Sequence, residues 1–145
     1  MKTLSLFIFI LIASNTSSEE NKSILIYGDS ISAGYGMEKE SQWSESLKTL
    51  LSDTGFKISV YNRSVSGETT GGGLTRISRI LDELKPTFLL LELGGNDALR
   101  GYPPKNIYEN LNKMIEASEK RGVEVFLMQI RILPNYGKRY QTQFE

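Results

Sequence analysis

The sequence predicts an α/β fold in which parallel strands alternate with helices around a single sheet. Two observations predict it. Short apolar runs typical of buried strands alternate along the chain with longer segments whose apolar residues repeat at helical spacing, and the segments that connect them are short. Such alternation implies parallel strands joined by right-handed crossovers, with helices on both faces of the sheet. A chain of 145 residues, 39% of them apolar, is one domain's worth and can bury one core.

Four segments have the length and composition of strands. They are residues 24–27, a short apolar run that ends at Gly28, then 57–61, 87–93 and 123–130. The third is the strongest, because four consecutive apolar residues from Phe88 to Leu91 suit a strand that is buried on both faces.

Three sets of apolar residues repeat at helical spacing between these strands. They are Trp43, Leu47, Leu50 and Leu51, then Leu74, Ile77, Leu81 and Leu84, and finally Ile107, Leu111, Met114 and Ile115. Gly55, Pro86 and Gly122 end the three helices, and the segment 136–145 could begin another. The elements together predict a three-layer α/β/α domain with a flavodoxin-like parallel sheet of order 2-1-3-4. A fifth strand is missing, which leaves the fourth strand as a bare edge.

Charge and composition exclude several classes of function. The 17 basic and 17 acidic residues balance, so nothing indicates a nucleic acid or an anionic membrane as a partner. The chain contains no cysteine, which excludes disulfides, a thiolate nucleophile and thiolate metal sites. It also contains no histidine, the usual metal ligand and the usual general base near neutral pH. We therefore expect no metal.

The first 18 residues have the pattern of a signal peptide. Lys2 supplies a positive charge, and a run of about ten mostly apolar residues, 4–13, is far shorter than the roughly 20 needed to span a bilayer. Small and polar residues follow, with cleavage expected before Glu19. We therefore expect a signal peptide at 1–18, a domain at 19–145, no stable membrane insertion and a periplasmic or secreted protein. A core helix or a retained anchor is the alternative.

Unusual loops follow the first three predicted strands. They are 28–34 (Gly-Asp-Ser-Ile-Ser-Ala-Gly), 62–69 (Asn-Arg-Ser-Val-Ser-Gly-Glu-Thr) and 93–97 (Leu-Gly-Gly-Asn-Asp). In open parallel sheets, ligand sites lie at the carboxyl ends of the strands, where the strand order reverses. Because neighbouring strands are about 4.8 Å apart, the order 2-1-3-4 predicts that Ser30, Gly67 and Asn96 converge on one small substrate group.

These residue types fit acyl transfer. A serine at a sharp strand-to-helix turn is exposed for attack, and the free N–H groups of the helix that follows favour a developing oxyanion. Gly67 offers an N–H with no side chain in the way, and Asn96 offers a side-chain amide. With the Ser30 N–H, they would place three donors around one tetrahedral oxygen. Taken alone, Ser30 could be a helix N-cap and Asn96-Asp97 an Asx turn.

The three loops resemble the sequence blocks of the SGNH (or GDSL) hydrolase family. Residues 28–30 resemble the block that holds the nucleophile, Gly67 within 66–69 resembles the glycine block, and 94–97 resemble the GxND block. The stretches 91–101 and 128–140 are similar to the bacterial thioesterase I/lysophospholipase and arylesterase branch in particular. The resemblance runs from about residue 24 to residue 145.

The resemblance implies Ser30 as nucleophile, with the Ser30 N–H, Gly67 and Asn96 forming the oxyanion hole. It implies a hydrolase of small acyl esters or thioesters that needs no cofactor, and it leaves the oligomeric state open. It also implies a fourth block, Asp-x-x-His, whose histidine is the general base and whose aspartate orients it. This block is absent from the chain, so we expect the SGNH domain at 19–145 to be incomplete at its carboxyl end.

Two other functions compete with this interpretation. One is a non-catalytic binding module, or relic, that keeps the SGNH fold. The other is a flavodoxin-like nucleotide binder, against which the acidic Asp29 argues. The triplet 71–73 (Gly-Gly-Gly) suggests a phosphate loop, but no Gly-Lys-Ser/Thr follows, and we expect it to be a flexible loop. Tyr102, Leu133 and Tyr136 could line an acyl pocket or be surface residues.

Overall fold

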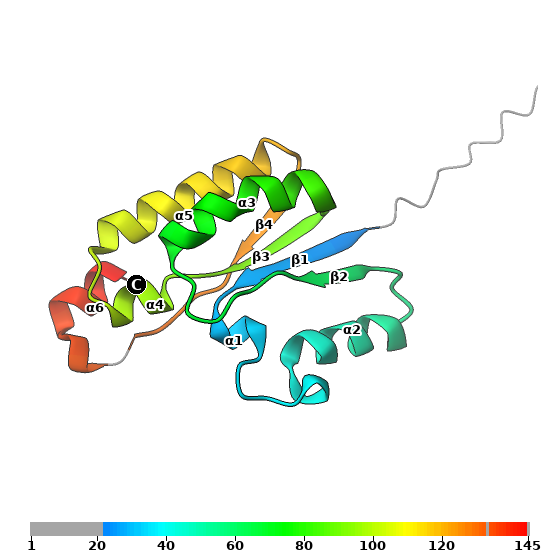
Figure 1. Ribbon diagram of the computed structural model, residues 1–145, viewed down its shortest axis with the longest axis horizontal. Helices are drawn as coiled ribbons and strands as arrows, with labels where there is room; N and C mark the ends of the chain where they lie inside the picture. Colours follow the sequence, from blue (N-terminus) through cyan, green and yellow to red (C-terminus); the bar gives the residue numbers. More distant parts are fainter. Residues whose placement is uncertain (1–21, 133, 145) are drawn as a thin grey trace, which may run out of the picture.

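The computed structural model describes residues 22–132 and 134–144, and it contains one four-stranded parallel sheet. The strand order is β2-β1-β3-β4, as predicted (Figure 1). The strands are β1 (Ser23–Gly28), β2 (Ser59–Asn62), β3 (Phe88–Glu92) and β4 (Glu124–Leu127). The order places β1 at the point where the chain reverses direction across the sheet, which is where ligand sites form in such folds.

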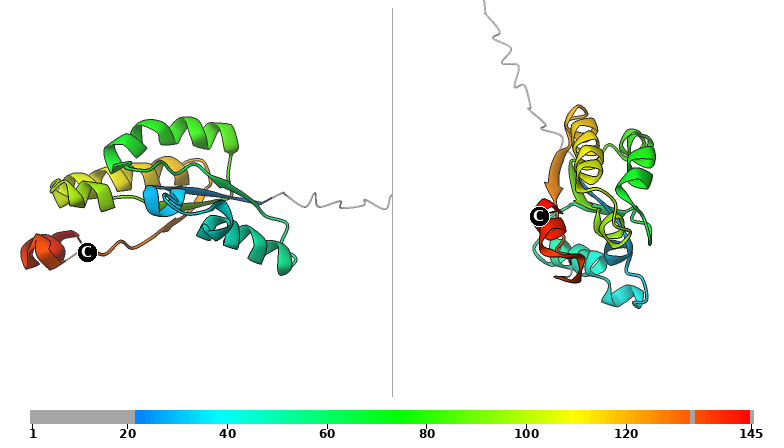
Figure 2. Two further views of the ribbon diagram at one scale, coloured as in Figure 1. Left: turned by 60° about the horizontal axis from the view of Figure 1, so that its bottom comes forward. Right: turned by 90° about the vertical axis from the view of Figure 1, so that its left-hand side faces the viewer.

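Helices cover both faces of the sheet, as predicted (Figures 1 and 2). They are α1 (Ser30–Ala33), α2 (Trp43–Asp53), α3 (Thr70–Leu84), α4 (Gly95–Leu99), α5 (Pro104–Glu119) and α6 (Lys138–Phe144), with short 3-10 turns at Lys39–Ser41 and Pro134–Tyr136. Helices α3 and α5 pack side by side on one face, and α1 and α2 lie on the other. Among the described helices, none is long and apolar enough to cross a membrane.

The core lies between the sheet and the pair α3/α5. Leu25 and Tyr27 of β1 and Leu89 and Leu91 of β3 point to this face, and all four are fully buried. They meet apolar side chains of the two helices, namely Ile77, Ile80, Leu81 and Met114. Burial of one such side chain stabilises the fold by about 1.5–3 kcal/mol, so this layer holds the sheet in place.

One sequence expectation about the helices was wrong. Gly71–Gly73 form the first turn of α3 instead of a flexible loop. The third glycine is buried because the helix lies close to the sheet: a Cβ on Gly73 would be 2.5 Å from the Leu93 side chain. In α2, Leu50 shares the helical spacing of Trp43 and Leu47 but is 60% exposed.

Strand β4 is shorter than the predicted 123–130. Its partner β3 ends at Glu92, and Gly94 then turns the chain away with φ of 118°. Met128 makes the last backbone hydrogen bond to β3, at 2.9 Å from the Leu91 carbonyl, and beyond it β3 no longer runs alongside. The predicted signal peptide at 1–18 lies outside the described residues.

Candidate active site

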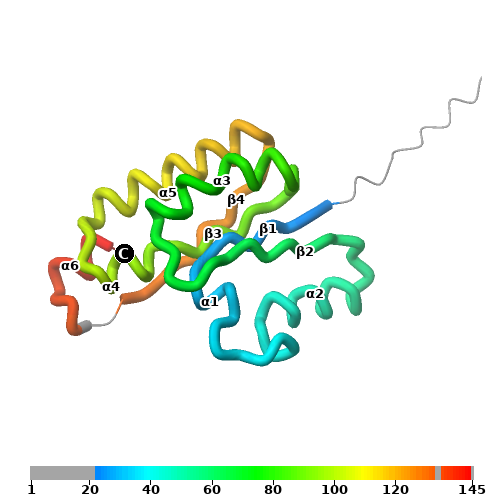
Figure 3. The backbone as a smooth tube through the Cα atoms, in the orientation of Figure 1, coloured from blue at the N-terminus to red at the C-terminus, as the bar shows by residue number. Residues whose placement is uncertain are grey.

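The chain leaves β1, β2 and β3 at the same end of the sheet, so the three unusual loops lie together there (Figure 3). The backbone ties the first two loops directly. The Val65 N–H donates to the Gly28 carbonyl at 3.0 Å, and the Arg63 N–H donates to the Ile26 carbonyl at 2.9 Å. These bonds extend the β1–β2 pairing past the end of β2, and they place the second loop beside the turn that carries Ser30.

Ser30 is the first residue of α1, at the turn directly after β1. The residue that caps this short helix is Asp29, whose Oδ1 accepts the Ile31 N–H at 3.0 Å. The capping role considered for Ser30 therefore belongs to its neighbour. Ser30 itself is half-buried, and neither its N–H nor its hydroxyl has a hydrogen-bond partner within the described residues. Both groups are available to a ligand.

A buried carboxyl group lies beneath this turn. Glu92, at the end of β3, is only 2% exposed, and its Oε2 accepts the Ser32 hydroxyl at 2.7 Å and the Asp29 N–H at 3.3 Å. Its Oε1 has no partner among the described residues. Burial raises the pKa of Glu92, the negative charge of Asp29 raises it further, and the bonds from Ser32 and Asp29 oppose the shift.

The second loop presents Gly67 in a left-handed conformation, with φ of 79°. A side chain is disfavoured at such a φ, although the space around Gly67 is open. Its carbonyl accepts Nη2 of Arg100 at 3.3 Å, which ties the second loop to the segment after α4. The Gly67 N–H is without a partner in the part of the chain that the structure describes.

The third loop brings Asn96 against the turn after β1. Its Nδ2 donates to Oδ2 of Asp29 at 2.9 Å. A primary amide carries two N–H bonds on that nitrogen, so one remains for a ligand. The neighbouring Asp97 is buried and structural, because it accepts the backbone N–H and the hydroxyl of Thr70 at 2.8 and 2.6 Å. Side chains thus join the third loop both to the first loop and to α3.

The structure therefore places the three sequence-predicted residues, Ser30, Gly67 and Asn96, on loops that are bonded to one another. Among the described residues, no cluster of acidic side chains could hold a metal ion.

Four residues with contacts to these loops were not predicted from the sequence. Asp29 and Glu92 bond to the first turn, Arg100 bonds to the Gly67 carbonyl, and Nε of Arg76 donates to Oε2 of Glu68 at 2.8 Å. Glu92 had one usable signal, since it is an acid in an otherwise apolar strand. Asp29 entered the sequence analysis only as an argument against a nucleotide binder, and its contact with Asn96 could not be predicted because the bond spans 67 positions of sequence.

An apolar pocket of about 360 Å³ lies on the α5 and α6 side of the third loop. Leu93, Ile107, Leu111, Ile130 and Phe144 are among the residues that line it. The two tyrosines considered for an acyl pocket are not among them. Tyr136 instead donates its hydroxyl to the Leu99 carbonyl at 3.5 Å, and Tyr102 is 46% exposed. Leu133 is outside the described residues.

Known proteins share this sequence and arrangement. The chain is 45% identical over 144 residues to an arylesterase of Vibrio mimicus, which covers 99% of this chain and 71% of that protein. It is 38% identical to thioesterase 1/protease 1/lysophospholipase L1 of Escherichia coli K12, over 95% of this chain and 64% of that protein. The chain thus spans about two thirds of the length of these curated relatives.

A solved structure and a family model agree with these relatives. The crystal structure of AlinE4, an SGNH-hydrolase family esterase, superimposes with a TM-score of 0.82 and 40% identity, over 88% of this chain and 69% of that one. The model of the GDSL-like Lipase/Acylhydrolase family matches residues 26–144. The match includes all three loops of the site, and the chain therefore belongs to the GDSL-like lipase/acylhydrolase family.

Proposed function

We propose that Ser30 is the nucleophile of a serine ester hydrolase that works through an acyl-serine intermediate. The observation that carries the proposal is the Asp29–Asn96 hydrogen bond, because it holds a free amide N–H against the turn that presents the serine. The substrate class is a small carboxylic ester or thioester, as in an esterase, arylesterase, lysophospholipase or acyl thioesterase. The names of the relatives from Vibrio mimicus and Escherichia coli support this range.

In the first step, Ser30 Oγ attacks the carbonyl carbon of the substrate and loses its proton to a base. The carbonyl oxygen takes up negative charge, which the N–H groups of Ser30, Gly67 and Asn96 stabilise. Each such donor contributes about 3 kcal/mol to the transition state. The carbon–oxygen or carbon–sulfur bond then breaks, the leaving group takes a proton, and water hydrolyses the acyl-serine.

The usual base in such a reaction is a histidine side chain, and none of the 145 residues is histidine. Loss of the histidine from a catalytic triad lowers kcat by about 10⁶, while the oxyanion hole preserves part of the acceleration. Asp29 is poorly suited to replace it, because both of its carboxylate oxygens are already occupied by Ile31 and Asn96. A test on this chain must therefore provide the base as free imidazole.

The experiment measures phosphonylation of the chain by an alkyl fluorophosphonate, with and without imidazole, using mass spectrometry to locate the label. We expect one label, on Ser30, with a rate that rises with the concentration of imidazole. Asn96→Ala is expected to lower this rate by about 10²–10³, the usual cost of removing one oxyanion donor.

Ser30→Ala should abolish the labelling, and Ser78→Ala is the matched control, because Ser78 is exposed on α3. Equal labelling of Ser30→Ala and the unsubstituted chain, or a label on another serine, would refute the assignment of Ser30. The same series with p-nitrophenyl acetate distinguishes an enzyme from a binding module: ester hydrolysis should depend on both imidazole and Ser30.

We also propose that the protein is exported to the periplasm or the medium with 1–18 as a signal peptide, in keeping with the pattern of the first residues. Expression of the gene in a Gram-negative host should give a protein whose first residue is Glu19. An unprocessed amino terminus in the exported fraction would contradict this.

A further inference from the structure

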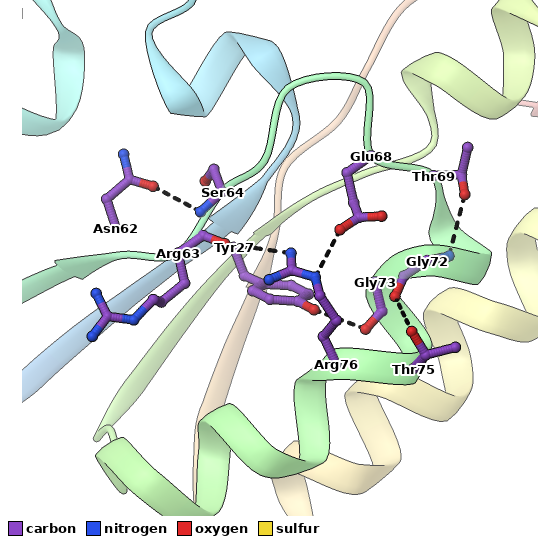
Figure 4. Close-up of polar contacts among 10 residues, drawn as sticks. All are labelled: Tyr27, Asn62, Arg63, Ser64, Glu68, Thr69, Gly72, Gly73, Thr75 and Arg76. Carbon is purple, nitrogen blue, oxygen red and sulfur yellow. Dashed lines mark hydrogen bonds and ion pairs between the residues drawn. The ribbon is translucent and has the colours of Figure 1, made fainter.

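Arg76 makes contacts with three separate parts of the molecule (Figure 4). It lies in α3, and its Nε donates to Oε2 of Glu68 at 2.8 Å while its Nη2 donates to the Arg63 carbonyl at 3.4 Å. Its guanidinium carbon is 4.9 Å from the centre of the Tyr27 ring in β1. One side chain thus connects a helix, a strand and both ends of the loop between Arg63 and Glu68.

The pair formed by Arg76 and Glu68 is largely shielded from water. Their side chains are 28% and 12% exposed. The Glu68 carboxylate also lies against Gly72, where a Cβ would collide with Oε1, so the missing side chain at Gly72 provides the space for it. A negative group is favoured at this place by the amino end of α3. Removal of one partner of such a pair leaves the other as an uncompensated buried charge.

The platform below the pair is rigid. The Tyr27 ring, over which the guanidinium lies, is fully buried, and its hydroxyl donates to the Gly73 carbonyl at 2.8 Å. The ring therefore has a fixed position relative to α3, and its face attracts the cation above it. The Tyr27 ring thus supports the Arg76 guanidinium on one face, while the guanidinium nitrogens bond to the loop.

The loop needs such an anchor because the space beside the Cα of Gly67 is open. The residue is exposed, and apart from its two chain neighbours no described residue has an atom within 4 Å of the position that its Cβ would take. Three polar contacts act on this part of the loop: the turn closed by the Glu68 N–H and the Val65 carbonyl at 3.1 Å, the bond from the exposed Arg100, and the shielded ion pair on Glu68. Of these, only the ion pair is both charged and protected from water.

We propose that Arg76 is a positioning residue for acyl transfer, whose grip on Glu68 and the Arg63 carbonyl aims the adjacent Gly67 N–H at the substrate oxygen. The inference rests on the proposed function, since it assigns a task to the Gly67 N–H. Arg76 itself does not touch the substrate; it acts through the loop.

The test compares the imidazole-assisted rate of Ser30 phosphonylation in four variants: Arg76→Gln, Glu68→Gln, the combination of both, and Arg76→Lys. We expect Arg76→Gln to lower the rate about 10–100-fold, which is part of the 10²–10³ attributable to a whole oxyanion donor. Addition of Glu68→Gln to Arg76→Gln should cost little more, because both changes break the same contact. Arg76→Lys should recover part of the rate, since a lysine reaches Glu68 but lacks the planar fork that also spans to Arg63.

Arg79→Gln is the matched control, because Arg79 is an exposed arginine of the same helix. A role confined to stability would lower the melting temperature without moving the Gly67 amide resonance in a ¹⁵N–¹H spectrum. We expect that resonance to shift in Arg76→Gln and to stay in place in Arg79→Gln. If Arg76→Gln does not fold, Glu68→Gln alone carries the test, because it removes the charge and keeps the shape.

The possible failures are distinguishable. An unsubstituted chain that is not labelled at Ser30 overturns the proposed function, and the role of Arg76 with it. A chain that is labelled at Ser30, together with folded Arg76→Gln or Glu68→Gln variants that react at the unsubstituted rate, overturns the positioning role alone.

Discussion

Gly28 and Gly71 are both glycines in regular secondary structure, and alanine is expected to change the stability of the fold in opposite directions at the two positions. At Gly28, a Cβ would lie 2.6 Å from Oε2 of Glu92 and 2.8 Å from both the Glu92 carbonyl oxygen and the Ser32 hydroxyl. Ordinary contacts begin at 3.4 Å. At Gly71, the nearest atoms are at 3.9 Å and φ is not positive.

The cost at Gly28 follows from what can move. Rotation of the Glu92 side chain breaks its 2.7 Å bond with Ser32, which costs about 1–3 kcal/mol for a buried group. The Glu92 carbonyl cannot withdraw, because Gly28 and Glu92 are paired in the β1–β3 register, and overpacking there costs about 1–3 kcal/mol. Gly28→Ala should therefore destabilise the fold by about 2–6 kcal/mol, which lowers Tm by roughly 6–18 °C for a chain of this size.

Gly71→Ala should raise Tm, because alanine in a helix is favoured over glycine by about 0.5–1 kcal/mol. Thermal unfolding followed by far-ultraviolet circular dichroism measures both variants against the unsubstituted chain. A Gly28→Ala variant that melts at or above the temperature of the unsubstituted chain would show that β1 and β3 do not approach as closely as described. A matching loss in Gly71→Ala would show that the first turn of α3 is wrongly assigned.

Two further predictions concern pH. Because the pKa of Glu92 is raised in the folded chain, its contribution to stability is present below the unfolded value of 4.5 and is lost as pH rises through the folded pKa. The Tm of Glu92→Gln should therefore rise relative to that of the unsubstituted chain between pH 4.5 and neutrality. A difference in Tm between the two proteins that stays constant over this range would contradict the shift. Burial raises the pKa of Tyr27 from 10.0 to about 12, so its contribution is lost as pH rises through that range. Tyr27→Phe, which loses the bond to Gly73, should have a lower Tm at neutral pH. Its free energy of unfolding, measured by urea titration, should fall less steeply between pH 10 and 12 than that of the unsubstituted chain. Equal slopes in the two proteins would argue against the assignment.

Alternating apolar runs predicted the strands and helices, because these patterns are local in sequence. The strand order 2-1-3-4 followed from a flavodoxin-like arrangement of these elements, and the structure has this order. The length of β4 was overestimated for a physical reason. Periodicity reports whether a segment suits a strand, but not where its partner turns away, as β3 does at Gly94. The start of α3 was missed because three glycines weigh against a helix. They are tolerated there because Gly72 and Gly73 make room for Glu68 and Leu93.

The contacts that complete the site were beyond sequence patterns, since each joins residues far apart in the chain. Asp29 meets Asn96, Glu92 meets Ser32, and Arg76 reaches past its own helix to Glu68. Nothing local to these positions indicates their partners. Glu92 is different, because a single acid breaks the apolar pattern of its strand. A buried acidic group needs polar groups around it, so such a residue can be used to predict a polar site.

The bond between the Asp29 carboxylate and the Asn96 amide also has a mechanical consequence. Two loops that are 67 positions apart in sequence move as one body at this point. When the turn after β1 moves thermally, the Asn96 amide moves with it. The distance between Ser30 and Asn96 therefore varies only as much as this hydrogen bond can stretch or bend, and the independent motions of two loops do not add to it. Alignment of these two groups should therefore persist on warming and disappear abruptly, when β1 and β3 separate.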